Sequence, residues 1–327
     1  MLSKSYSSIN KAFKYIDESP IISGSFSDVY QVIDIPSGKV YMKKVFNTDF
    51  ISDILKEISI NKKISNNNSP YIIEYIGSNI EDLNENGDAE EIYMISEFPS
   101  KGQLINYMKC SIYGFNDQIC KLIIYKVLKA LEKMHQNGIF HGNINPQNIW
   151  LDGERYQIKL GDFSFSEFFY SESSEKSYFQ GKKGKEQYMA PEMLLHHKKY
   201  DGVKTDIFSI GVLLFVLRTL KIPFSIDEVK HSGTIKGKLY GFIKDKNIPR
   251  YWNELNQLYQ TQFNKEINLD PQFKDLFIKM IAYNPAERPT IEEIFNHPYM
   301  AEVFHANQEQ FLLYENNLIE ELNKIDL

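Results

Sequence analysis

Three short polar segments between residues 140 and 192 hold the residue types that could carry out chemistry. The first reads FHGNINPQNI at 140–149, the second GDFS at 161–164, and the third YMAPE at 188–192. The first is rich in amides and the second contains a carboxylate, and side-chain oxygens of both kinds can ligate Mg²⁺. What these groups can do depends on the elements that bring the three segments together.

The chain up to residue 98 contains short runs of β-branched and aromatic residues. Strands are predicted at 21–33, as strand, turn and strand around Gly24, and at 39–46, 71–76 and 92–98. Residues 49–64 have helical spacing, with Ile51, Ile54 and Ile58 apolar and charged residues between them. The acidic stretch at 81–91 predicts a solvated hairpin loop. This part of the chain is therefore expected to be a small β-rich lobe with one helix.

After Gly102 the pattern becomes helical, with helices predicted at 104–110, 117–137 and 205–220. Residues 207–217 are apolar nearly all round, which indicates a buried helix. The tail at 308–327 has apolar residues at helical spacing, namely Phe311, Leu318, Leu322 and Ile325. It predicts an amphipathic helix packed on a larger helical lobe, with a partner-binding helix as the alternative.

Composition places the 327-residue chain among ordinary globular proteins, with 43% hydrophobic and 24% charged residues. A formal net charge of -6 argues against a nucleic-acid-binding surface. Two cysteines, Cys110 and Cys120, are too few for a disulfide framework. No apolar run approaches the roughly 20 residues that span a bilayer. Residues 1–10 are polar without a signal-like apolar region. We expect a cytoplasmic protein without membrane contact, with the cytoskeleton as one assembly it could join.

The order and spacing of the three polar segments resemble the catalytic loop, the DFG element and the APE element of protein kinases. Further segments agree with this resemblance, at 21–30 (glycine-rich loop), 40–43 (lysine strand), 57–58 (helix glutamate), 96–98 (hinge), 206–211 (buried helix), 284–289 and 297–298. It covers residues 13–300. Segments 206–224 and 251–252 look most like the calcium/calmodulin-dependent group of serine/threonine kinases.

The resemblance implies a bilobal α+β kinase fold. Its expected parts are an N-terminal segment at 1–12, a small lobe at 13–98, a large lobe at 99–300 and a helical tail at 301–327.

Three positions that the family uses for phosphoryl transfer differ in this chain. The carboxylate that accepts the substrate hydroxyl's proton corresponds to Asn143, and an amide cannot take that proton. The lysine that steadies the γ-phosphate corresponds to Asn145, and the threonine that ties these two residues together corresponds to Lys185. Loss of a general base costs roughly 10²–10⁴ in rate. The three changes together indicate relaxed constraint on phosphotransfer.

Four other positions keep the residue types of a nucleotide site. By resemblance, Asn148 and Asp162 are the metal-binding pair, and Lys43 and Glu57 are the ion pair that holds the α/β-phosphates. A purely structural role is equally open. The ion pair also fixes the helix to the sheet, and Asp162 can cap local backbone.

The glycine-rich loop is reduced. Only Gly24 remains, and Ile22 and Ser27 stand at the flanking glycine positions, which limits how closely backbone N–H groups can approach phosphates. The resemblance completes this nucleotide-binding remnant with residues of the next strand and the hinge, namely Val29, Glu97 and Phe98.

The slot for the adenine ring is expected to be filled by two aromatic residues. The family's small alanine above the ring corresponds to Tyr41, and the aliphatic residue below it to Trp150. Stacked aromatic rings would close the cleft to ATP. Since Lys43 and Lys44 are adjacent, the strand could be shifted by one residue, which places Met42 above the ring. The slot is smaller than the family's in either register.

The regulatory positions differ, whereas the positions that hold the fold are kept. Gly142 replaces the arginine that pairs with a phosphorylated activation loop, so a modified loop would lack its cation. Glu192 and Arg288 correspond to the family's buried ion pair, and Asp206 to the anchor of the catalytic-loop backbone. The loop itself carries the serines Ser166, Ser171, Ser173, Ser174 and Ser177.

We therefore expect a pseudokinase that acts as a binding scaffold for a protein partner, or as a structural subunit of a larger assembly. The alternative is an active protein serine/threonine kinase with an atypical catalytic loop, which must account for Asn143, Asn145 and Lys185 together. No tightly held cofactor is expected, and weakly bound Mg·ATP is the remaining candidate.

Overall fold

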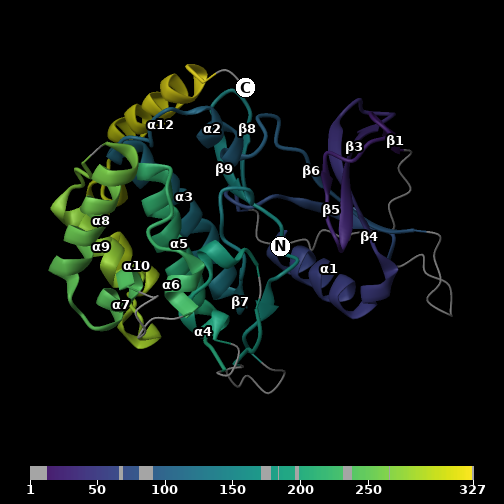
Figure 1. Cartoon of the computed structure of the whole chain (residues 1–327). Helices are drawn as coiled ribbons and strands as arrows, with labels where there is room; N and C mark the ends of the chain where they lie inside the picture. The colour runs from purple at the N-terminus through teal and green to yellow at the C-terminus, as the bar shows by residue number, and fades with distance from the viewer. Residues whose placement is uncertain are drawn as a thin grey trace.

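The structure, a computed structural model, describes residues 13–65, 69–80, 91–170, 178–182, 184–195, 199–230, 238–264 and 266–325. Figure 1 shows a small lobe built on a sheet, with α1 packed beside it, and a larger helical lobe. The predicted two-lobed α+β fold is confirmed. The expected loop at 81–90, the N-terminal segment and four of the five activation-loop serines lie outside the described residues.

The small lobe is a twisted antiparallel sheet. In the described part of the chain its strands lie in the order β1-β3-β4-β6-β5, and β2 pairs with β3. The strands are β1 (Phe13–Tyr15), β2 (Ile22–Ser23), β3 (Ser27–Asp34), β4 (Val40–Phe46), β5 (Tyr75–Ser78) and β6 (Ile92–Glu97). Successive side chains of a strand point to opposite faces. The register of β4 therefore decides which of its residues face the large lobe.

Helix α1 (Ile51–Ser65) closes one face of this sheet. Its Ile54 and Ile58 pack with Phe46 of β4 and Tyr75 of β5 in one buried cluster. Glu57 lies on the same buried side of the helix. A charged residue is almost never fully buried without a partner, so this position indicates an ion pair across to the sheet.

The large lobe is mainly helical, with short strand pairs at its border with the small lobe. Its helices are α2 (Leu104–Cys110), α3 (Asp117–Gln136), α4 (Pro191–Leu194), α5 (Gly202–Thr219), α6 (Ile226–Lys230), α7 (Lys238–Lys244), α8 (Ile248–Phe263), α9 (Pro271–Met280), α10 (Ile291–Phe295), α11 (Pro298–Phe304) and α12 (Gln308–Asn323). Its strands are β7 (Ile139–Phe140), β8 (Ile149–Asp152), β9 (Gln157–Leu160) and β10 (Glu167–Phe168). None of the helices in the described ranges is both long and apolar enough to cross a membrane.

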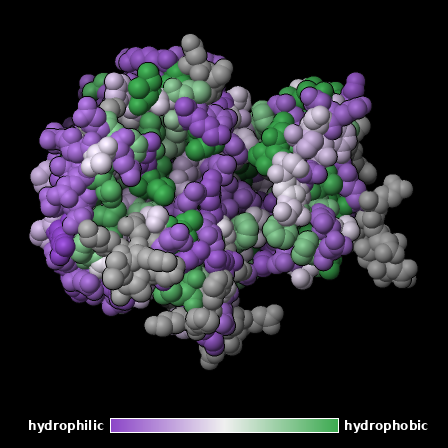
Figure 2. Space-filling view, viewed as in Figure 1, coloured by the Kyte–Doolittle hydropathy of each residue, from purple (hydrophilic) through white to green (hydrophobic). Residues whose placement is uncertain are grey.

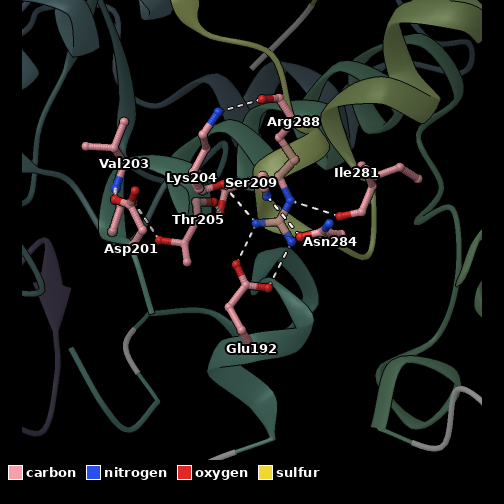
Figure 3. A network of polar contacts seen from close by, with 12 residues as sticks. Glu192, Asp201, Val203, Lys204, Thr205, Ser209, Ile281, Asn284 and Arg288 are labelled. Atoms are coloured by element: carbon pink, nitrogen blue, oxygen red, sulfur yellow. Dashed lines mark hydrogen bonds and ion pairs between the residues drawn. The ribbon is translucent and has the colours of Figure 1, made fainter. Parts of the chain in front are cut away.

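Helix α5 forms the centre of the large lobe. All residues of its stretch 205–217 are buried, as predicted for a helix that is apolar nearly all round. At its N-terminal end the guanidinium of Arg288 forms a double hydrogen bond with Glu192, with N···O distances of 2.6 and 2.8 Å. Arg288 also donates to the carbonyl oxygen of Lys204 (Figure 3). A further hydrogen bond joins it to the carbonyl oxygen of Ala282. The predicted ion pair is therefore present and joins segments far apart in the sequence.

The tail helix α12 packs on the large lobe, across α3 (Figure 1). Leu318 and Leu322 are buried in the main hydrophobic core, and Phe311 and Ile325 pack against it. The predicted amphipathic helix is confirmed, with the orientation expected from its apolar positions. The expected boundary between lobe and tail, at residue 300, falls inside α11. Figure 2, seen from the same side as Figure 1, shows hydrophilic residues over most of the visible face of the large lobe. Hydrophobic residues lie where the small lobe faces the large lobe.

Candidate functional site

A cavity of about 560 Å³ lies between the two lobes. The small lobe contributes Val29, Met42 and Lys44 to its wall, and the large lobe contributes residues in or beside the first two polar segments and in the stretch just before the third. These include Asn143, Asn145, Asn148, Trp150, Asp162 and Lys185. The topology thus brings together residues more than 150 positions apart in the chain. A volume of this size is within the range of small-molecule binding pockets.

The lysine of this cavity is Lys44, which corrects the prediction of Lys43. The ammonium of Lys44 lies 2.6 Å from the Glu57 carboxylate and 3.6 Å from the Asp162 carboxylate. Burial alone would lower the pKa of Lys44, but the two carboxylates raise it above its ordinary value. Lys44 is therefore a largely buried cation held in place by α1 on one side and by the large lobe on the other.

Lys43 points to the opposite face of the sheet. Its ammonium pairs with the Glu91 carboxylate and donates a 2.6 Å hydrogen bond to the Tyr15 hydroxyl. It also lies over the rings of Tyr15 and Tyr93, 4.8 and 4.4 Å from their centroids. A shift of one residue moves every side chain of a strand to the other face. Two adjacent lysines conceal such a shift in the sequence.

The same register change corrects the expected position of Tyr41. Tyr41 packs with Val32 and Ile95 on the outer face and meets the Phe13 ring edge-on at 5.8 Å. Met42 takes the place above the cavity. The prediction that Tyr41 closes the cleft from above is therefore wrong, because Tyr41 and Met42 alternate in direction along β4.

Trp150 lies below the cavity, as predicted. It belongs to one buried cluster with Met42 and Ile73, and Val29 and Phe98 pack against this cluster. The roof and the floor of the slot are thus part of one hydrophobic cluster that joins the two lobes. Of the two aromatic residues expected to close the slot, Trp150 lines the cavity and Tyr41 does not. A large cavity remains beside the cluster.

The reduced glycine-rich loop forms the turn between β2 and β3. Ile22 pairs with Val29 across these strands, and the Gly24 N–H donates a 3.1 Å hydrogen bond to the Ser27 carbonyl. All four residues line the cavity. Glu97 does not, because its carboxylate pairs with Lys159 of β9 at 2.8 Å.

Asn143 stands where the resemblance places the proton-accepting carboxylate, and its side chain is held on both sides. Its amide donates to the Asp162 carboxylate across 3.4 Å. Its side-chain carbonyl accepts hydrogen bonds from the Asn145 amide and from the Lys185 backbone N–H, each at 3.0 Å. The three altered positions therefore form one connected cluster. The side-chain oxygen at the central position is occupied, and a neutral amide oxygen is a poor proton acceptor at any ordinary pH.

Asn145 has no charge to offer at the cavity. It is buried, and its side-chain oxygen accepts the Gln147 N–H at 3.0 Å. Its amide divides its bonding between the backbone and side-chain carbonyls of Asn143. This side chain stabilises the loop from within, in place of a cation.

Asn148 and Asp162, the metal-binding pair by resemblance, both line the cavity. The Asn148 amide donates to the Asn143 carbonyl at 2.8 Å, and among the described residues no donor occupies its side-chain oxygen. Burial would raise the pKa of Asp162, but Lys44 and the Ser164 hydroxyl lower it below its usual value. The described residues contain no group of three acidic, histidine or cysteine side chains that could bind a metal alone. Mg²⁺ commonly takes one or two protein oxygens together with phosphates, which these two residues fit.

Asp206 of α5 holds the loop that carries Asn143. Its carboxylate accepts the backbone N–H groups of His141 and Gly142 at 2.8 and 2.9 Å, and His135 at 2.9 Å. This matches the predicted anchor. Gly142 has a φ of 75°, and a Cβ there would lie 2.6 Å from the Phe165 carbonyl. Only glycine fits this position without strain.

Several lining residues were not predicted from the sequence. Asn61 of α1, Ser96 of β6 and Gln147 of the catalytic loop face the cavity. Helical spacing gives a signal for Asn61, because it follows Glu57 by one turn. Ser96 follows Met94 by two residues in a strand, so the two point to the same face. Gln147 carries no such pattern.

Comparison with known proteins agrees with the geometry. Residues 15–300 match the protein kinase domain family. The chain is 28% identical over 281 residues to the serine/threonine-protein kinase dst1 of Dictyostelium discoideum, covering 85% of this chain and 33% of that protein. It is 29% identical over 321 residues to the probable cyclin-dependent kinase 8 of the same organism, covering 89% and 81%. A mitogen-activated protein kinase of Fusarium vanettenii is 26% identical over 320 residues, covering 93% and 86%.

The match spans only part of several of these relatives. It covers 33% of dst1 and 24% of the mitosis inducer protein kinase cdr2 of Schizosaccharomyces pombe. The similarity therefore concerns the domain and not the whole of those proteins.

Proposed function

Since the chain belongs to the protein kinase domain family, we propose that it is a pseudokinase that binds a nucleoside triphosphate between its lobes without transferring phosphate to proteins. In this proposal it acts by presenting a defined surface to a protein partner. Mg·ATP is the ligand that the residues of the cavity fit. Lys44, Asn148 and Asp162 would hold its phosphates and metal ion, and the metal would supply charge neutralisation.

The observation that carries the proposal is the state of Asn143. Its Oδ1 accepts two hydrogen bonds, and its Nδ2 donates to Asp162. A general base must reach the proton that it removes and must have a pKa that suits the task. An amide oxygen already bonded to Asn145 and Lys185 satisfies neither condition. This supports loss of proton transfer more directly than the sequence change alone.

Nucleotide binding is supported by the corrected position of the lysine. Lys44, Glu57 and Asp162 form a connected set of charges at the wall of a cavity of about 560 Å³, with Glu57 buried and Lys44 largely so. A charge network of this kind in a cleft is a common mark of a functional site. Because Tyr41 lies on the other face of β4, the cavity has room that the sequence alone did not predict.

The second candidate is an active protein serine/threonine kinase. The retained Lys44–Glu57 pair and the position of Asp162 favour it, since they are also the parts that catalysis needs. It would require a proton acceptor other than Asn143, or a reaction in which the loss of the base has little effect. Membership of the calcium/calmodulin-dependent-like group remains a prediction, because the similar proteins include kinases with several different names.

A scaffold role is supported by what the chain keeps. The Glu192–Arg288 pair, the Asp206 anchor and the buried helix α5 all hold the fold and are intact. A protein that only binds needs these elements and does not need a base. Residence in the cytoplasm, and a place in a larger assembly, are part of this proposal.

The test of the proposed function is phosphotransfer under multiple turnover. The natural protein would be incubated with γ-labelled ATP, Mg²⁺ or Mn²⁺ and generic protein substrates, beside an Asp162→Ala variant. We expect no label on protein above the level of that variant. Label that appears with the natural protein and disappears with Asp162→Ala would favour the active kinase instead.

A further inference from the structure

Lys185 places a cation at the cavity. By resemblance, position 185 is notable only because it lacks the family's threonine. Lys185 lines the same cavity as Lys44, Asn148 and Asp162, from the large lobe and from the segment that precedes η3 (Glu186–Tyr188), whereas Lys44 comes from the small lobe. Its ammonium donates a 2.9 Å hydrogen bond to the Gln147 side-chain oxygen, and Gln147 also lines the cavity. A charged group of the segment before η3 therefore lies against Gln147 of the catalytic loop, two residues along the chain from the uncharged Asn145.

The backbone fixes Lys185 against this loop. The Lys185 N–H donates to Asn143 Oδ1 at 3.0 Å. The preceding Gly184 has a φ of 87°, and a Cβ on it would lie 2.6 Å from the Gly142 carbonyl and 2.7 Å from Asn143 Oδ1. Glycine at 184 is what allows the two segments to approach so closely. The backbone from which the Lys185 side chain extends is thus fixed against the catalytic loop.

Within the described ranges, the charge of Lys185 is not neutralised by a neighbouring carboxylate. Among the described residues, no carboxylate lies within 4.0 Å of its ammonium, and its one bonded partner is a neutral amide. Burial, together with the charge of Lys109, lowers its pKa below the ordinary lysine value. An anion beside Lys185 would neutralise its charge and raise its pKa again. By contrast Lys44, the cation on the other side of the cavity, already has two carboxylates.

We propose that Lys185 binds the terminal phosphate of the nucleoside triphosphate, so that this pocket distinguishes a triphosphate from a diphosphate. The inference rests on the proposed nucleotide binding and adds the residue that reads the last phosphate. Asn148 and Asp162 would hold the metal ion that joins the phosphates. Lys185 then contributes a cation from the activation segment, in place of one from position 145.

The role proposed for Lys185 is binding, and it does not restore the missing proton acceptor. Lysine ammonium is a compact point charge that serves well against phosphate. The same side chain carries no group that could take a proton from a substrate hydroxyl while it is charged. A pocket that holds a triphosphate without consuming it would suit a protein whose partner recognises the nucleotide-bound form.

The test compares equilibrium dissociation constants for Mg·ATP and Mg·ADP, measured by calorimetry on the full chain. Three variants accompany the natural protein: Lys185→Met, Lys185→Arg, and Lys182→Met as the matched control. Lys182 lies on the same segment, but its ammonium is paired with Glu186. Thermal unfolding of each variant without nucleotide checks that it is folded.

We expect the natural protein to bind ATP more tightly than ADP. Lys185→Met should weaken ATP binding by about tenfold or more, the usual effect of losing one charge-assisted hydrogen bond to phosphate. ADP binding should stay within about twofold, and Lys185→Arg and Lys182→Met should keep the preference for ATP.

Two results would overturn the inference, and they are distinguishable. If the natural protein binds neither nucleotide, the proposed nucleotide binding fails and the role of Lys185 fails with it. If it binds both but Lys185→Met leaves the ratio of the two constants unchanged, nucleotide binding stands and the role of Lys185 is refuted.

Discussion

The ammonium of Lys44 lies 2.6 Å from the carboxylate of Glu57 and joins β4 to α1 at the wall of the interlobe cavity. Lys43, the next residue back along the strand, points away and pairs with Glu91. The chain therefore offers a matched comparison. The two lysines are adjacent on one strand, but they lie on opposite faces of the sheet and have different partners.

Lys44→Ala is expected to abolish detectable binding of Mg·ATP, whereas Lys43→Ala should leave it nearly unchanged. The reason is that Lys44 faces the cavity and Lys43 does not. Thermal shift would measure this, since a ligand at about 100 times its dissociation constant stabilises the fold by roughly 2.7 kcal/mol. A shift that survives in Lys44→Ala and disappears in Lys43→Ala would show that the register of β4 is wrong.

Widening the slot should strengthen nucleotide binding. Met42 and Trp150 form the roof and floor of one cluster, so Met42→Ala combined with Trp150→Leu makes room for the adenine ring. The double variant should be less stable without ligand, because Met→Ala in a core costs about 2–5 kcal/mol. Its thermal shift with Mg·ATP should exceed that of the natural protein. Tyr41→Leu is the control, because Tyr41 lies on the other face of β4, and it should leave the shift unchanged.

Breaking the buried pair at the base of α5 should destabilise the fold without touching the cavity. Glu192→Gln leaves the fully buried guanidinium of Arg288 without its counter-charge, and loss of one partner of such a pair costs roughly 3–5 kcal/mol. Denaturant unfolding measures this. The exposed Lys246–Glu287 pair supplies the comparison, since Glu287→Gln should leave the stability almost unchanged. Equal effects of the two substitutions would contradict the burial of the first pair.

Stability should fall as the pH drops below 6.5, partly because of His141. The backbone N–H of Asn143 donates to its Nδ1, and its Nε2 faces the Gly161 carbonyl, so the ring is neutral. Burial lowers the pKa of His141 below 6.5, although nearby carboxylates oppose this. The unfolded chain then takes up a proton that the folded protein refuses, and the contribution, fully present above pH 6.5, is lost as the pH falls toward the folded pKa.

The measurement for His141 is the free energy of unfolding between pH 7.5 and 5. A single group contributes at most about 1.4 kcal/mol per pH unit. His141→Gln should flatten the curve, whereas His305→Gln, at an exposed position of the C-terminal region, should keep the slope of the natural protein. If both variants kept the full slope, His141 would not be the group responsible.

Much of the fold could be predicted from local patterns. The buried helix α5 follows from a stretch that is apolar nearly all round, and the tail helix α12 follows from apolar residues that recur on one face. The register of β4 could not be predicted, because either Lys43 or Lys44 can be aligned with the family's lysine. A strand was predicted at 71–76, but β5 begins at Tyr75, and Ile72 forms only an isolated bridge with Leu160. That bridge depends on the large lobe, so no local signal reveals it.

The candidate site was predictable in the identity of its residues and less so in their directions. Asn143, Asn145 and Lys185 do form one cluster, as their roles in the family suggest. The direction of the Lys185 side chain depends on the close approach that Gly184 permits and on Gln147 as a partner. Such contacts join segments forty residues apart, and only the folded chain determines them.

The central claim is that this kinase domain holds a nucleotide without transferring its phosphate. A single-turnover measurement tests it most directly, with the protein in excess over γ-labelled Mg·ATP and the fate of the label followed over hours. The natural protein should return intact ATP. A variant with the family's residues at the three altered positions, Asn143→Asp, Asn145→Lys and Lys185→Thr, should convert bound ATP to ADP and label protein. Conversion by the natural protein, abolished by Asp162→Ala, would contradict the claim.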